Sequence, residues 1–80
     1  MQTILVIDDD ESLRDTIAVM LEQEGFRAVL AADGREGFEK TLLLKPDLLL
    51  VDLRLPGMTG TEICKQLRAS GSQTPIPLQY

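Results

Sequence analysis

Two short aliphatic runs, each ended by aspartate, constrain the fold of this chain more than any other feature. Residues 4–7 and 48–51 are apolar throughout; an acidic triplet, residues 8–10, follows the first run, and Asp52 follows the second. Uninterrupted apolar runs of this length are typical of strands that are covered on both faces of a parallel sheet. We therefore expect two buried parallel strands at these positions.

Three helical patterns accompany the aliphatic runs. They begin after Asp10, Asp33 and Thr59, which are all favourable N-cap residues, and the last two are followed three positions later by glutamate, as in a capping box. Gly25 suits the position after the last turn of the first helix. The expected helices cover residues 11–24, 33–44 and 59–70.

Apolar side chains at helical and strand spacing predict the core. One face of the first helix carries leucine, isoleucine and methionine at positions i, i+4, i+7 and i+8, which is the pattern of an amphipathic helix. The residues expected to be buried are Leu13, Ile17, Met20 and Leu21 in the first helix, Ile63 and Leu67 in the third, and the leucines at 42–44 and 48–50.

The order of elements predicts an α/β fold. Residues 26–31 and 74–80 read as second and fourth strands, although Pro75 and Pro77 disfavour the latter because proline has no N–H for a sheet. Strands that alternate with helices of this length pair in parallel through right-handed crossovers. We expect one domain over residues 1–80, with the order β-α-β-α-β-α-β.

Charge and composition exclude several classes of function. Thirteen acidic residues against eight basic ones give a net charge of −5, which argues against binding to nucleic acid or to an anionic membrane. The single cysteine, Cys64, has no partner for an internal disulfide, and no apolar run is long enough to span a bilayer. We therefore expect a cytoplasmic protein.

Carboxylates mark the ends of the two most apolar strands. If these strands are neighbours, their ends lie about 4.8 Å apart, and Asp8 and Asp9 face Asp52. Three carboxylates at this distance repel each other, and a hard divalent cation such as Mg²⁺ would neutralise them. A carboxylate beside such a cation is able to attack phosphorus. An aspartate after a strand is also a common helix cap, and we interpret Asp10 in this way.

Longer motifs around these residues resemble a known family. The sequence reads ILVIDDDE at residues 4–11, ADGREG at 32–37 and KPDLLLVDLRLPGMTG at 45–60. In combination these motifs strongly resemble the bacterial response regulator receiver domain of two-component systems. The resemblance implies a flavodoxin-like (CheY-like), doubly wound parallel sheet with strand order 2-1-3-4.

The resemblance also implies roles for individual residues. Asp52 would accept a phosphoryl group from a sensor histidine kinase or a phosphotransfer protein. Asp8 and Asp9 would hold Mg²⁺ together with Asp52, with Asp9 the more direct ligand of the pair, and the backbone carbonyl of Arg54 would be a further ligand. Such a chain is a signalling phosphoacceptor rather than an enzyme, with self-catalysed phosphorylation of its aspartate at most.

The chain departs from the family at its C-terminal side. A complete receiver domain has five βα units, and we expect the equivalents of the fourth helix, the fifth strand and the fifth helix to be missing, together with the lysine of the fifth strand. Phosphotransfer would then be impaired, and an uncovered apolar face would favour a homo-oligomer. Two alternatives stay open: a non-catalytic fragment that docks on a kinase or self-assembles, and a phosphatase, although Arg54 stands where a dehalogenase-like phosphatase has a second aspartate.

Overall fold

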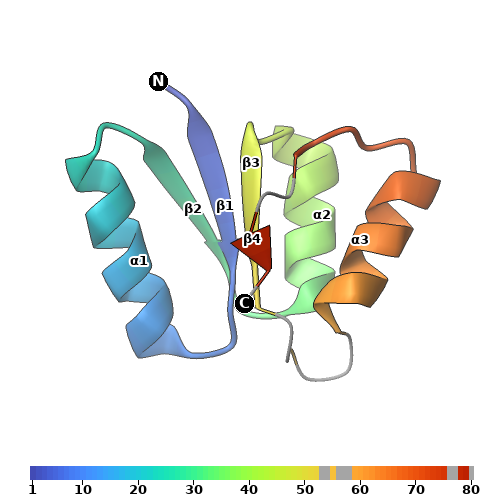
Figure 1. Cartoon of the computed structure of the whole chain (residues 1–80), viewed down its shortest axis with the longest axis horizontal. Coiled ribbons are helices and arrows are strands. Elements are labelled where there is room, and N and C mark those ends of the chain that lie inside the picture. Colours follow the sequence, from blue (N-terminus) through green and yellow to red (C-terminus); the bar gives the residue numbers. More distant parts are fainter. Residues whose placement is uncertain (53–54, 56–58, 76–77, 80) are drawn as a thin grey trace.

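A four-stranded parallel sheet forms the centre of the molecule (Figure 1). The computed structural model describes residues 1–52, 55, 59–75 and 78–79. The strands β1 (Thr3–Ile7), β2 (Arg27–Ala31), β3 (Leu48–Val51) and β4 (Leu78–Gln79) lie in the order β2-β1-β3-β4, and each neighbouring pair is parallel. The predicted α/β class and the strand order 2-1-3-4 are confirmed.

Helices cover both faces of the sheet. Helix α1 (Glu11–Gln23) packs on one side against β1 and β2, whereas α2 (Gly34–Leu44) and α3 (Gly60–Ala69) lie on the other side (Figure 1). The helices alternate with the strands along the chain. Their distribution over both faces of the sheet is as expected for a doubly wound fold.

The predicted caps are present at all three helix starts. The side chain of Asp10 accepts a hydrogen bond from the Leu13 N–H at 3.1 Å, and Asp33 accepts one from the Glu36 N–H at 2.8 Å. Thr59 caps α3 in the same way. Each such cap stabilises its helix by about 1 kcal/mol, because it satisfies an N–H that has no partner within the helix.

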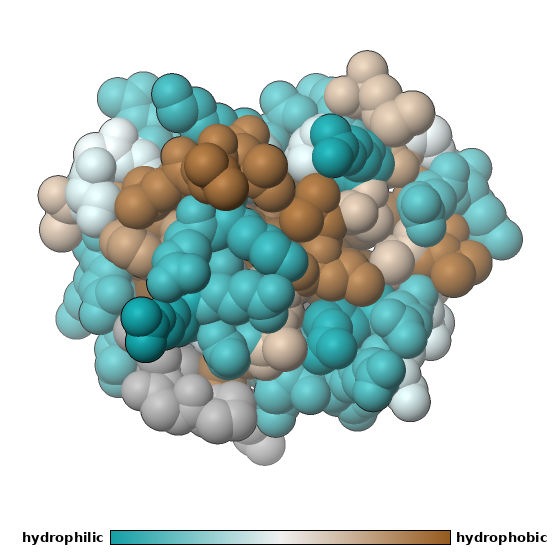
Figure 2. Space-filling view, turned by 180° about the vertical axis from the view of Figure 1, so that it is seen from behind, coloured by the Kyte–Doolittle hydropathy of each residue, from teal (hydrophilic) through white to brown (hydrophobic). Residues whose placement is uncertain are grey.

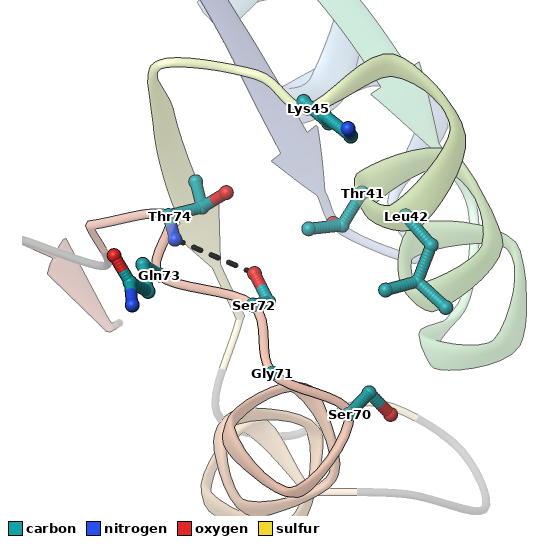
Figure 3. Close-up of a pocket in the computed structure, with 8 residues that line it drawn as sticks. All are labelled: Thr41, Leu42, Lys45, Ser70, Gly71, Ser72, Gln73 and Thr74. Carbon is teal, nitrogen blue, oxygen red and sulfur yellow. Dashed lines mark hydrogen bonds between the residues drawn. The ribbon is translucent and has the colours of Figure 1, made fainter.

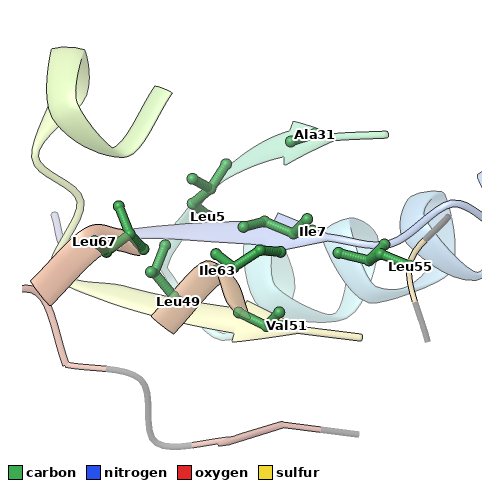
Figure 4. Close-up of a cluster of buried hydrophobic side chains, with 8 residues drawn as sticks. All are labelled: Leu5, Ile7, Ala31, Leu49, Val51, Leu55, Ile63 and Leu67. Atoms are coloured by element: carbon green, nitrogen blue, oxygen red, sulfur yellow. The ribbon is translucent and has the colours of Figure 1, made fainter. Parts of the chain in front are cut away.

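The main core lies between the sheet and the two helices of the second face (Figure 4). Ile63 and Leu67 of α3 are fully buried there, as predicted, against alternate residues of β1 and β3. A fully buried leucine or isoleucine contributes about 1.5–3 kcal/mol to folding. The buried cluster consists of Leu5, Ile7, Ala31, Leu49, Val51, Leu55, Ile63 and Leu67.

The prediction for the buried face of α1 was wrong in part. Leu13 is exposed and Met20 is 60% exposed, because the helix is rotated toward a neighbouring set of positions. The most buried residue of α1 is the small Ala18, which lets the helix approach the sheet closely. The less exposed face consists of Arg14, Ile17, Ala18 and Leu21.

The leucines at 42–44 are not core residues, contrary to the prediction. All three are exposed, Leu43 to 79%, and the view from behind shows hydrophobic side chains at the surface among hydrophilic ones (Figure 2). Three consecutive helical residues point in different directions, so they cannot all face the sheet. The face of α2 that does so carries Thr41 and two glycines. In β3, Leu49 is buried, while Leu48 and Leu50 are half-buried.

Helix α2 approaches β1 very closely at Gly37. A Cβ atom at this position would overlap the Ile7 side chain, lying 2.7 Å from its Cγ1 atom. Only glycine therefore allows the helix to sit at this distance from the strand, and Ile7 is the residue that precedes Asp8.

The fourth strand is shorter than predicted. It consists of Leu78–Gln79 rather than residues 74–80, and it pairs with Leu50 and Val51 of β3. Before it, the carbonyl oxygen of Pro75 accepts a hydrogen bond from the Leu49 N–H at 3.0 Å. Pro75 itself has no N–H to donate to β3, as expected for a proline beside a sheet.

Candidate functional site

The C-terminal ends of β1 and β3 bring the predicted acidic residues together. Ile7 is in register with Val51, and the next residues along the two strands are Asp8 and Asp52. The Asp52 N–H donates to the Ile7 carbonyl oxygen at 2.9 Å, and the Asp8 N–H donates to the Ala31 carbonyl oxygen at 3.1 Å. Backbone hydrogen bonds of the sheet therefore continue into both aspartates and fix their positions.

Three carboxylates meet at this edge of the sheet. Oxygen atoms of Asp8, Asp9 and Asp52 all lie within 4.8 Å of one another. The three residues differ in burial: Asp8 is only 1% exposed, Asp52 is half-buried and Asp9 is exposed. The cluster thus has a buried base and an open side, through which a ligand could enter.

The loop between β1 and α1 is held by polar contacts to Asp8. One carboxylate oxygen of Asp8 accepts a hydrogen bond from the Asp10 N–H at 2.8 Å, and the Asp8 carbonyl oxygen accepts one from the Arg14 guanidinium at 2.9 Å. The Asp10 side chain is turned to the start of α1 instead. The interpretation of Asp10 as a cap rather than as part of the carboxylate cluster is therefore confirmed.

The chemistry of the donor atoms suits a hard divalent cation. Three carboxylates supply only oxygen donors, and the chain has no histidine. Mg²⁺ is bound in proteins by few carboxylates together with water and phosphate oxygens. The fourth predicted ligand, the backbone carbonyl of Arg54, lies outside the described residues.

A second polar group lies at the neighbouring end of β2. Glu36 accepts a hydrogen bond from the Ala32 N–H at 2.7 Å and pairs with Lys40 at 2.9 Å, while Lys40 also donates to the Leu30 carbonyl oxygen. The Ala32 hydrogen bond, followed by the Lys40 ammonium, holds the pKa of Glu36 below its ordinary value. The glutamate of the predicted capping box thus reaches the residue before the cap, and it ties α2 to the end of β2.

Arg14 is the residue near the cluster that the sequence analysis missed. It lies on the less exposed face of α1 and reaches back six positions to Asp8. The available signal was a basic residue within the apolar face of a helix that directly follows an acidic triplet. An apolar pattern does not identify such a residue, because the pattern consists of apolar side chains alone.

A separate pocket lies at the opposite end of the sheet (Figure 3). Its volume is about 400 Å³, and it is formed by the end of α2 and the segment after α3, which precede β3 and β4 respectively. Ser72 and Thr74, joined by a hydrogen bond across this segment, are among its lining residues. Since the carboxylates follow β1 and β3 rather than precede them, this pocket is not part of their cluster.

Comparison with known families agrees with this geometry. The model of the "Response regulator receiver domain" family matches residues 4–78, nearly the whole chain. The chain belongs to this family. A receiver domain is a signalling domain of two-component phosphorelay systems, and the identification made from the motifs is confirmed.

Curated relatives of this receiver domain are longer proteins. The sensory transduction protein RegX3 of Mycolicibacterium smegmatis is 44% identical over 72 residues, which are 90% of this chain and 32% of the relative. The DNA-binding response regulator MtrA of Mycobacterium leprae is 45% identical over 75 residues, 94% of this chain and 33% of the relative. The chain thus spans about a third of the length of these curated relatives.

Solved receiver structures share the fold. The chemotaxis response regulator CheY4 of Vibrio cholerae superposes with a TM-score of 0.91 at 34% identity, covering 98% of this chain and 67% of that one. The response regulator TrrA of Thermotoga maritima, solved in complex with Mg²⁺ and BeF, gives a TM-score of 0.83 at 31% identity over 88% of this chain and 61% of that one. Among the described residues, no helix has the length and apolar character needed to cross a membrane.

Proposed function

We propose that Asp52 accepts a phosphoryl group from a sensor histidine kinase or a phosphotransfer protein, with Mg²⁺ held by Asp8, Asp9 and Asp52. The observation that carries this proposal is the convergence of the three carboxylates within 4.8 Å at the ends of β1 and β3. The Mg²⁺ and BeF complex of the relative TrrA supports it. The Arg54 carbonyl is proposed as a further ligand on the resemblance alone.

Asp52 has the position that a nucleophile needs. Its backbone is fixed by the hydrogen bond to Ile7, and its side chain is half-buried, so a phosphodonor has access to it. One carboxylate oxygen forms a bond to phosphorus while the bond from phosphorus to the donor's imidazole nitrogen breaks. That nitrogen keeps the electron pair and takes up a proton from solvent, and the product is an acyl phosphate. Bound Mg²⁺ would supply charge neutralisation between the phosphoryl group and the carboxylates.

Asp8 and Asp9 divide the remaining work. Asp8 is buried and hydrogen-bonded, so its carboxylate is held in place. Asp9 is exposed, and its carboxylate is the one that solvent and an entering cation meet first. This arrangement supports Asp9 as the more direct cation ligand and Asp8 as the fixed base of the site.

Phosphorylation by a small phosphodonor tests the proposal. The chain is incubated with acetyl phosphate and Mg²⁺, and intact-mass spectrometry measures the fraction that gains one phosphoryl group. We expect a gain that requires Mg²⁺, is lost in Asp52→Asn and is kept in Asp15→Asn, which changes an exposed aspartate of α1. A folded wild-type chain without this gain contradicts phosphotransfer and favours the non-catalytic docking or self-assembling module.

We also propose that residues 1–80 form a cytoplasmic receiver domain that self-associates and does not bind nucleic acid. Self-association is supported by Leu48 and Leu50 of β3. They belong to the same face of the sheet as α1, but α1 packs against β1 and β2, and the two leucines are only half-buried. The net charge of −5 opposes binding to nucleic acid.

Light scattering at tens of micromolar tests the self-association. We expect a homo-oligomer that dissociates in Leu50→Glu but persists in Leu43→Glu, because Leu43 is exposed elsewhere on α2. A monomeric wild-type chain at this concentration contradicts the proposed assembly and leaves the phosphotransfer proposal untouched.

A further inference from the structure

Arg14 is linked directly to the backbone of the acidic site. Its side chain is half-buried on α1, and one guanidinium nitrogen donates to the Asp8 carbonyl oxygen at 2.9 Å. The peptide that carries this oxygen joins Asp8 to Asp9, so Arg14 holds the unit between two carboxylates of the cluster. A hydrogen bond from a charged donor is stronger than one between neutral groups.

Within the part of the chain that the structure describes, the turn between β1 and α1 has few other restraints on the side of Asp9. Asp8 is fixed by the Ala31 carbonyl oxygen and by the Asp10 N–H, whereas Asp9 is exposed. Repulsion among three carboxylates acts to move the exposed one away from the other two. A restraint on the peptide before Asp9 opposes this movement.

The guanidinium also lies close enough to α2 to affect Glu36. The pKa of Glu36 is lowered mainly by the Ala32 hydrogen bond and by Lys40, and Arg14 adds a smaller effect through its charge. Arg14 therefore donates a hydrogen bond to the end of β1, and its charge has a weak effect on the first turn of α2.

We propose that Arg14 is a positioning residue for phosphoryl transfer to Asp52: it holds the peptide between Asp8 and Asp9 so that both carboxylates keep their distance to Asp52. This inference rests on the proposed function. A guanidinium suits the task because it stays charged at any physiological pH and donates in a fixed plane. Removing a partner that orients a metal-binding residue typically weakens metal affinity 10–100-fold.

Mg²⁺ titration of matched arginine variants tests the inference. Arg14→Gln is compared with Arg35→Gln, which removes the same charge from a side chain that is 88% exposed and paired with Glu39 on its own helix. Amide NMR shifts give the Mg²⁺ dissociation constant of the folded chain. We expect it to rise about tenfold or more in Arg14→Gln and to stay near the wild-type value in Arg35→Gln.

Phosphorylation kinetics separate positioning from a purely structural role. With acetyl phosphate, the Mg²⁺ concentration for half-maximal rate should rise in Arg14→Gln, while saturating Mg²⁺ should restore most of the rate. A role in stability alone would lower the melting temperature without changing the dissociation constant of the folded protein. Arg14→Lys keeps the charge but has a shorter reach and no planar fork, so an intermediate Mg²⁺ affinity is expected.

The Mg²⁺ affinity of the folded Arg14 variants decides whether Arg14 is a positioning residue. A folded Arg14→Gln with wild-type Mg²⁺ affinity overturns the inference, and if that variant does not fold, wild-type affinity in Arg14→Lys overturns it instead. A wild-type chain that binds no Mg²⁺ and takes no phosphate contradicts the proposed function, and this inference falls with it. A wild-type chain that does both, beside unaffected Arg14 variants, contradicts the role of Arg14 alone.

Discussion

The backbone N–H of Asp52 donates a hydrogen bond to the carbonyl oxygen of Ile7 at 2.9 Å, which joins the residue after β3 to the last residue of β1. Asp8 follows Ile7 directly, so sheet hydrogen bonds rather than a flexible loop set the separation of the two aspartates. This is the sense in which the fold makes the site: the parallel pairing of two apolar strands places their terminal carboxylates side by side. The strands themselves are stabilised by burial, and the site uses their geometry.

Neutralising Asp9 should affect the stability of the chain and its affinity for Mg²⁺ in different ways. Without Mg²⁺, Asp9→Asn should be at least as stable as wild type, because one of three repelling carboxylates becomes neutral. With Mg²⁺ at about 100 times its dissociation constant, wild type gains about 2.7 kcal/mol, and a tenfold weaker affinity reduces this by about 1.4 kcal/mol. Thermal unfolding with and without Mg²⁺ measures both effects.

Asp15→Asn is the control for this experiment, since it neutralises an exposed aspartate of α1 that is not part of the carboxylate cluster. Its response to Mg²⁺ should match that of wild type. An unchanged response in Asp9→Asn would show that Asp9 is not a ligand.

The assignment of Asp10 as a cap predicts a different response. Asp10→Ala removes the hydrogen bond to the Leu13 N–H and should lower the free energy of unfolding by about 1 kcal/mol. The backbone N–H of residue 10 still reaches Asp8, so Mg²⁺ affinity should change little. Denaturant unfolding gives the first quantity and Mg²⁺ titration the second.

Asp10→Ser provides the comparison, because serine also caps helices. It should recover most of the stability that Asp10→Ala loses. A large loss of Mg²⁺ affinity in both variants would instead make Asp10 a functional member of the cluster.

The close approach of α2 to β1 makes Gly37 a sensitive position. In Gly37→Ala the added Cβ would overlap Ile7, and such overpacking costs about 1–3 kcal/mol. The higher helix propensity of alanine recovers up to about 1 kcal/mol. We expect a net loss of stability of about 1 kcal/mol, together with weaker Mg²⁺ binding, because Ile7 precedes Asp8.

A double-mutant cycle with Ile7→Val checks the cause. Valine lacks the Cδ1 atom of isoleucine, which is the atom closest to the added Cβ. The double variant should therefore be more stable than the two single changes predict when added. Simple additivity would mean that Gly37 acts through some other contact.

The sequence was sufficient to predict that the three carboxylates lie together, because these residues follow directly after two strands. Asp8 and Asp52 could be placed together once residues 4–7 and 48–51 were recognised as neighbouring parallel strands, which needs only local apolar runs and a topology rule. Burial on the helices was harder to predict. The leucines at 42–44 look like core in a sequence window, yet the helical period and the contact made by Gly37 decide which face meets the sheet.

Arg14 shows a second limit of such reasoning. Its contact with the Asp8 carbonyl oxygen depends on the rotation of α1, which buries the small Ala18 and leaves the larger Leu13 and Met20 exposed. Apolar patterns identify that a helix is amphipathic, but here the largest apolar side chains did not mark the face that meets the sheet.

Glu36, which links α2 to the end of β2, should make the free energy of unfolding depend on pH. Since the pKa of Glu36 is lower in the folded chain than its ordinary value of 4.5, the charged form stabilises the native state. This contribution is fully present above the ordinary pKa and is lost as the pH falls through the lower, folded-state pKa. Denaturant unfolding from pH 7 to acid, compared between wild type and Glu36→Gln, should show wild type more stable near neutrality and the difference vanishing in acid.

Glu39→Gln is the matched control, because its partner Arg35 is largely exposed and such pairs contribute little. Parallel pH profiles for wild type and Glu36→Gln would contradict the role of the Ala32 hydrogen bond.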